Sequence, residues 1–115
     1  MKQVSELAKA LGFEVVCPGE DPHREVSGGV YCCDLLSIAM GRARSDGVWV
    51  TVMANVNAVA VAVLCDVACV VIAEGMAIDE TTRKKAVDQG VCLLHTDLPI
   101  YDAAKAADRF LSDEA

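Results

Sequence analysis

The chain has 115 residues, of which 54% are hydrophobic, and a formal net charge of −7 at pH 7. This length predicts a single domain, residues 1–115, which can bury roughly two thirds of the surface that its unfolded chain exposes. Because the surface is acidic, a polyanion is repelled on average, and nucleic acid is excluded as an expected partner.

The N-terminal residues MKQVSELAKALGF show no export signal. Glu6 and two lysines lie inside an amphipathic pattern, and no apolar run with a small-residue cleavage site follows. We therefore expect a cytoplasmic protein whose cysteines stay reduced and form no disulfides. The six cysteines are Cys17, Cys32, Cys33, Cys65, Cys69 and Cys92.

The most apolar segment is NVNAVAVAVLCDVACVVIAEG, residues 55–75. A membrane-spanning helix needs about 20 apolar residues, and Asn57 and Asp66 interrupt this segment. Asp66 at the middle of a bilayer would cost about 2.5–3.5 kcal/mol. We expect no contact with a membrane and two buried elements that are divided at Asp66.

Apolar residues at helical spacing predict a helix over residues 4–11, which Gly12 ends. The stripe consists of Val4, Leu7, Ala8 and Leu11. A short strand is expected over residues 13–17. Prolines, glycines and charges in PGEDPHREVSGG predict an exposed loop over residues 18–29.

After an apolar run at residues 30–33, Asp34 is predicted to cap a helix that ends near residues 45–47. One side of this helix is expected to carry Leu35, Leu36, Ala39, Met40 and Ala43. GVWVTVM, residues 47–53, is rich in β-branched residues and predicts a strand. Either Asn55 or Asn57 then caps the next element.

Residues 56–64 alternate Ala and Val, which suits a strand, but their position between two strands favours a crossover helix. CVVIAEG, residues 69–75, predicts a buried strand. A helix over residues 80–89 is expected between Asp79 as its cap and Gly90 at its end. VCLLHT is the last strand.

The final helix is predicted to begin near Asp97 and Pro99. Its apolar face comprises Ala103, Ala107, Phe110 and Leu111. Helices that alternate with buried strands predict an α/β fold with three layers, in which a mostly parallel sheet of about five strands has helices on both faces.

Four segments resemble the DRTGG domain family, which is also similar to the N-terminal domain of HPr kinase/phosphorylase. YCCDLLSIAMGRA is similar to the early helix of the family, and DGVWVTV to the strand that follows. CVVIAEG is similar to the next strand, and HTDLPIYDAAKAA to the last junction of strand and helix. The resemblance covers most of the chain and is strongest from Tyr31 onward.

The positions that give the family its name fall, by this resemblance, on Ala54, Asn55, Ala73, Glu74 and Gly75. Gly75 alone keeps the residue of the family. Asn55 offers a neutral amide where an arginine would grip phosphate with two hydrogen bonds. The resemblance implies a divergent, stand-alone member, from a family whose domains regulate or join subunits rather than catalyse.

Ligands of open parallel sheets bind beyond the carboxyl ends of the strands. The residues expected at that edge are Gly28, Gly29, Thr51, Asn55, Asn57, Glu74, Gly75, His95 and Thr96. A helix that begins at Asn55 or Asn57 would also offer free N–H groups to an anion. Capping and turn formation explain the same residues without a ligand.

Other reactive side chains give weaker signals. His95 could act as a base, although no nucleophile stands beside it, and His23 lies in the charged loop. The cysteines lack a pair of CxxC motifs, so the core is favoured over a metal or iron–sulfur site, and Cys69 and Cys92 are expected to be the least reactive. Gly28-Gly29 lacks the Lys and Ser/Thr of a P-loop.

We expect a non-catalytic regulatory or ligand-sensing domain, with no cofactor and no metal. It is predicted to form a homodimer and to bind a small polar or anionic metabolite or a partner protein. The alternatives are an adaptor or assembly protein without a ligand pocket, and a thiol- or metal-dependent protein.

Overall fold

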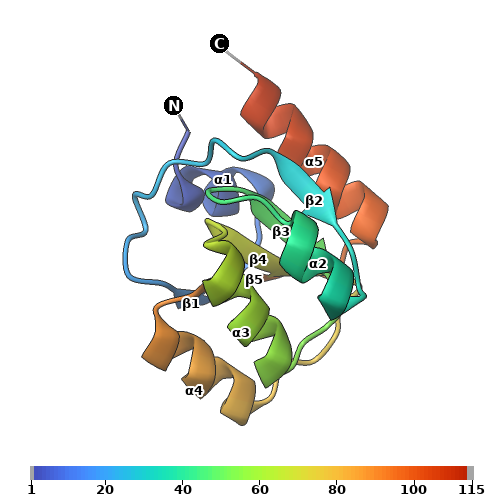
Figure 1. Cartoon of the computed structure of the whole chain (residues 1–115). Coiled ribbons are helices and arrows are strands. Elements are labelled where there is room, and N and C mark those ends of the chain that lie inside the picture. Colours follow the sequence, from blue (N-terminus) through green and yellow to red (C-terminus); the bar gives the residue numbers. More distant parts are fainter. Residues whose placement is uncertain (1, 114–115) are drawn as a thin grey trace.

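The computed structural model describes residues 2–113, which form one five-stranded sheet covered by five helices (Figure 1). The strands are β1 (Glu14–Pro18), β2 (Val30–Cys32), β3 (Val48–Thr51), β4 (Cys69–Ile72) and β5 (Cys92–His95). The helices are α1 (Val4–Leu11), α2 (Leu36–Arg42), α3 (Val56–Cys65), α4 (Glu80–Gln89) and α5 (Ile100–Ser112).

The strand order is β1-β5-β4-β3-β2. The four strands from β2 to β5 run parallel, with Val71 of β4 opposite both Val50 of β3 and Leu94 of β5. The edge strand β1 pairs antiparallel with β5 and has an irregularity between Val15 and Cys17. The predicted α/β fold with a mostly parallel sheet is therefore confirmed.

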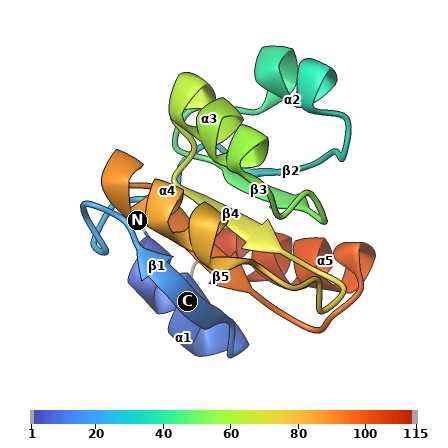
Figure 2. The same cartoon turned by 90° about the horizontal axis from the view of Figure 1, so that it is seen from below.

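The helices form two layers around the sheet. Helices α1 and α5 cover one face, and α2, α3 and α4 cover the other (Figure 2). Successive strand residues point to opposite faces, so Val71 packs under α1 and α5 whereas Val70 and Ile72 pack under the other layer. Both faces of β3 and β4 are buried, which explains their continuous apolar sequence.

The ambiguous segment after Asn55 is a helix, and its ends follow from local chemistry. The Asn55 side chain accepts a hydrogen bond from the Ala58 N–H at 2.9 Å, so Asn55 is the cap and Asn57 lies within the first turn. Asp66 ends α3 in the left-handed conformation with φ 56°. Within residues 2–113 no helix has the length and apolarity that crossing a membrane requires.

Two predictions about α2 are wrong. Asp34 does not cap the helix, because its carboxylate accepts hydrogen bonds from the Thr51 hydroxyl and the Val52 N–H. The expected apolar side is also split. Ala39 is buried, but Leu35 and Met40 lie on the surface with exposed fractions of 58% and 49%.

The remaining elements agree with the sequence. Gly12 and Gly90 end α1 and α4 in the left-handed conformation, and Asp79 caps α4 by accepting from the Thr82 N–H at 2.8 Å. Pro99 directly precedes α5, whose Ala103 and Ala107 are buried as expected.

Candidate functional site

The carboxyl ends of the parallel strands form the edge at which the sequence predicts a ligand. Each of β2, β3, β4 and β5 leads directly into the helix of the same number, so four helix N-termini gather there. A helix N-terminus carries a partial positive charge and unpaired N–H groups. This edge, which we call the carboxyl edge, therefore favours negative charge.

Seven of the nine predicted site residues lie at or next to the carboxyl edge. They are Thr51, Asn55, Asn57, Glu74, Gly75, His95 and Thr96. Gly28 and Gly29 do not, because they precede β2 and therefore lie at the amino ends of the strands. A Cβ on Gly28 would stand 2.4 Å from the Ser45 carbonyl oxygen, so this glycine permits a close approach of two backbones.

Thr51 is fully buried and its hydroxyl is used within the protein. The hydroxyl donates to the Asp34 carboxylate at 2.7 Å and accepts from the Met53 N–H at 3.2 Å. These bonds connect the loop after β2 to the loop after β3. Thr51 therefore shapes the carboxyl edge and presents no hydroxyl to a ligand.

Glu74, Gly75 and Thr96 join the loop after β4 to the loop after β5. The Glu74 carboxylate accepts from the Ile100 N–H at 2.8 Å and so binds the first turn of α5. The Gly75 N–H donates to the Thr96 carbonyl at 3.0 Å. Glu74 and Gly75 both have positive φ, 62° and 65°, which bends the chain sharply at the end of β4.

His95 is held by two neighbours. Its Nε2 lies 3.1 Å from the Met76 carbonyl oxygen, and its Nδ1 lies 3.4 Å from the Glu14 carboxylate. A ring that donates from Nε2 to Met76 can donate from Nδ1 to Glu14 only when it is protonated. These contacts fasten β5 to β1 and to the loop after β4.

The N-terminus of α3 differs from those of α4 and α5. Asp79 caps α4, and the Glu74 carboxylate accepts from the Ile100 N–H of α5, whereas the Asp34 carboxylate binds the Thr51 hydroxyl and the Val52 N–H instead of α2. Within residues 2–113, α3 has only the neutral amide of Asn55 as its cap and no acidic residue in its first turn. Asn57, in that turn, is exposed.

A crevice lies beside this N-terminus, between α3 and α4. Its lining includes the partly exposed Met53, Ala54 and Asn55 and the buried Ile72 and Leu93. The lining is mostly apolar and closed, because it leaves no volume for a water molecule. A ligand that inserts here has to separate α3 from α4.

A polar hollow lies at the opposite edge, around Arg24, which the sequence analysis did not single out. This hollow has a volume of about 210 Å³ and is lined in part by Arg24, Asp66 and Gly90. Burial opposes the charge of Arg24, but its hydrogen bond to Asp46 and the charge of Asp66 outweigh burial and raise the Arg24 pKa. A lone arginine in an acidic loop is the signal that sequence reasoning could have used.

The cysteines, all of which lie among the described residues, have free thiols. Burial raises the pKa of Cys69 and raises the pKa of Cys92 to about 12, so both thiols are inert. Over residues 2–113 no cluster of three His, Cys, Asp or Glu side chains is arranged to hold a metal ion.

No protein-family profile matches the sequence, and no curated protein matches it. The fold does match a solved structure, the CBS and DRTGG domains of the regulatory region of Clostridium perfringens pyrophosphatase, complexed with its activator, diadenosine tetraphosphate. The TM-score is 0.74 at 10% identity over 92% of this chain, which spans 46% of the other. The chain therefore has a DRTGG-like fold, similar to that of a regulatory region.

Proposed function

We propose that this domain is a non-catalytic regulatory module that senses a small polar or anionic metabolite at the N-terminus of α3. The observation that carries the proposal is the distribution of carboxylates at the carboxyl edge. Glu74 and Asp79 bind the N-termini of α5 and α4, whereas α3 has the neutral Asn55. The partial positive charge of α3 is thus left for a ligand.

Two further observations support an anionic ligand. The net charge of −7 repels anions from most of the surface, so the N-terminus of α3 is a local exception. The neighbouring fold belongs to a regulatory region that was solved with a polyphosphate activator. Asn57 adds an exposed amide that can hydrogen-bond to such a ligand.

The conformational change on ligand binding would be an opening of the closed crevice between α3 and α4. A ligand held at Asn55 and Asn57 that also enters the crevice between Ala58 of α3 and Thr82 of α4 favours an arrangement with the helices apart. Such a ligand binds the open arrangement more tightly than the closed one, and this difference in affinity shifts the population toward the open arrangement. A non-catalytic role fits His95, since both ring nitrogens face protein atoms.

The test is a thermal-shift series with pyrophosphate, ATP, diadenosine tetraphosphate and, as a neutral reference, adenosine. A ligand at 100 times its Kd stabilises the native state by about 2.7 kcal/mol. Asn57→Asp places a carboxylate in the first turn of α3 and should abolish the shift. Thr81→Asp adds the same charge at the equivalent position of α4 and should leave it intact.

The second candidate function is an adaptor or assembly protein without a ligand pocket. The closed crevice and the exposed apolar side chains of α3, Val63 and Leu64, favour it. A flat response to all four compounds in both the parent protein and Asn57→Asp would support the adaptor and contradict the sensor. In either role we propose that the protein acts as a homodimer.

A further inference from the structure

The outward side of α3 is apolar except for Asn57. The side chains that face the sheet and its neighbours are Ala58, Val59, Val61 and Ala62. The outward arc comprises Val56, Asn57, Ala60, Val63 and Leu64, and all five are exposed. A helix that is apolar on all sides is normally buried on all sides, so a monomer leaves one side of α3 unsatisfied.

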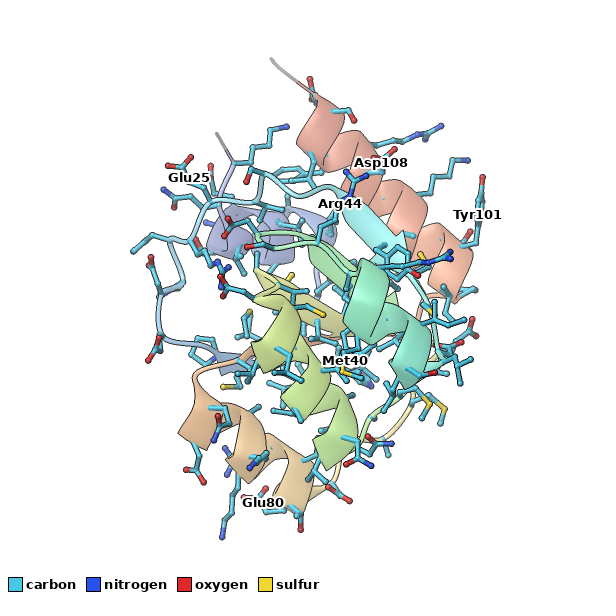
Figure 3. All side chains as sticks on the ribbon, in the orientation of Figure 1. Glu25, Met40, Arg44, Glu80, Tyr101 and Asp108 are labelled. Atoms are coloured by element: carbon cyan, nitrogen blue, oxygen red, sulfur yellow. The ribbon has the colours of Figure 1, made fainter. Side chains whose placement is uncertain are left out.

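Helix α2 extends this apolar surface. The Cys65 thiol at the end of α3 donates to the Met40 carbonyl oxygen at 3.4 Å, so α2 packs against α3 there. Figure 3 shows the Met40 side chain lying where α2 meets α3. We define the α3 face as Met40, Val56, Ala60, Val63 and Leu64.

We propose that the α3 face pairs with the α3 face of a second copy of this chain about a twofold axis near Ala60. This inference rests on the proposed homodimer and assigns it an interface, but it does not depend on the ligand. In an antiparallel pair, Val56 of one copy faces Leu64 of the other, since both lie four residues from Ala60. The small Ala60 side chain lets the two helices approach closely.

The distribution of charge favours the α3 face over the other faces of the molecule as the place where a second copy binds. The chain contains 17 acidic residues, yet between Leu35 and Cys65 the sole acidic residue is Asp46, and Arg42 and Arg44 lie in the same segment. Two molecules with a net charge of −7 repel one another on average, and the repulsion is weakest where acidic side chains are absent. The opposite layer carries exposed acidic residues, such as Asp102 and Asp108 of α5.

Sedimentation velocity over a micromolar to millimolar concentration series tests the pairing. The parent protein should shift from monomer to dimer, and Leu64→Glu should raise the dimer dissociation constant by about tenfold or more, because it places a charge against the apolar Val56 of the other copy. Tyr101→Glu is the matched control. Tyr101 is 70% exposed, as Leu64 is, but projects from α5 on the opposite side of the sheet (Figure 3). The Tyr101→Glu variant should therefore still form the dimer.

A complementing pair of variants tests the register. Leu64→Glu and Val56→Lys should each be monomeric alone, and a mixture of the two should form a heterodimer through opposite charges. A dimer that survives Leu64→Glu overturns the α3 face but leaves the homodimer standing. A parent protein that stays monomeric overturns both, and a mixture that stays monomeric overturns the pairing of Val56 with Leu64.

Discussion

The two helix layers both cover a face of the sheet, but their helices differ in the pattern of apolar and charged residues. Helices α1 and α5 are amphipathic, with apolar residues toward the sheet and charged residues such as Glu6 and Lys105 outward. Helix α3 has no charged residue from Val56 to Cys65, although part of it faces outward. The α1 and α5 helices thus direct their charged residues outward, whereas α3 leaves apolar side chains exposed.

The largest expected effect contrasts one substitution in the two layers. Leu7→Ala removes a side chain that is 0% exposed under α1 and should lower the free energy of unfolding by about 2–5 kcal/mol. Leu64→Ala, at 70% exposure on α3, should change it by less than about 0.5 kcal/mol in dilute protein. Urea unfolding at low micromolar concentration gives both values. Equal losses would contradict the exposed α3 face.

The rates of thiol labelling should differ between Cys65 at the end of α3 and Cys92 in the sheet. At about pH 8 a thiol with a pKa of about 12, as for Cys92, is thiolate in roughly one molecule in ten thousand, and Cys92 is also buried. Cys65, at the end of α3, is half-buried, and burial raises its pKa less strongly. Mass spectrometry after brief labelling should find Cys65 modified well before Cys92. Labelling of Cys92 at the rate of Cys65 in native protein would refute the packing described for β5.

The cap of α3 should have an intermediate effect. Asn55→Ala removes the acceptor of the Ala58 N–H and should destabilise the protein by about 1 kcal/mol. Asn57→Ala is the control, because Asn57 is exposed in the same helix and does not cap it; its effect should stay below about 0.5 kcal/mol. Both values come from urea midpoints. The reverse ranking would show that Asn57 is the cap.

The smallest effect is a pH dependence at the start of α4. The hydrogen bonds from Thr82 lower the pKa of Asp79 in the folded state. The stabilisation is therefore present above the unfolded pKa, about 3.9, and is lost as the pH falls through the lowered folded value. In Asp79→Asn the cap is kept without titration. We expect the free energy of unfolding of the parent protein to exceed that of this variant at about pH 7, and the difference to shrink when both are unfolded at about pH 2. A difference that grows on acidification would show that the pKa of Asp79 is raised instead of lowered.

The candidate site was partly predictable. The spacing of strands and loops placed Thr51, Glu74 and His95 near one edge, because the carboxyl ends of parallel strands always meet there. The spacing along the sequence could not show that the Glu74 carboxylate binds the Ile100 N–H, since those residues are 26 positions apart. Gly28 was placed at the wrong edge, because a glycine pair before a strand suits either a turn or a ligand loop.

The sequence by itself determined the elements and most of their ends. Helical spacing, the cap Asp79, and the left-handed Gly12 and Gly90 act within a few residues of the chain, so they can be read locally. The sequence left the cap of α3 open between Asn55 and Asn57, and the structure decided for Asn55. The tertiary structure alone decided that Asp34 serves β3 instead of α2, and that the outward side of α3 lies open. Those outcomes depend on strand order and on contacts between distant segments, and local spacing carries no information about either.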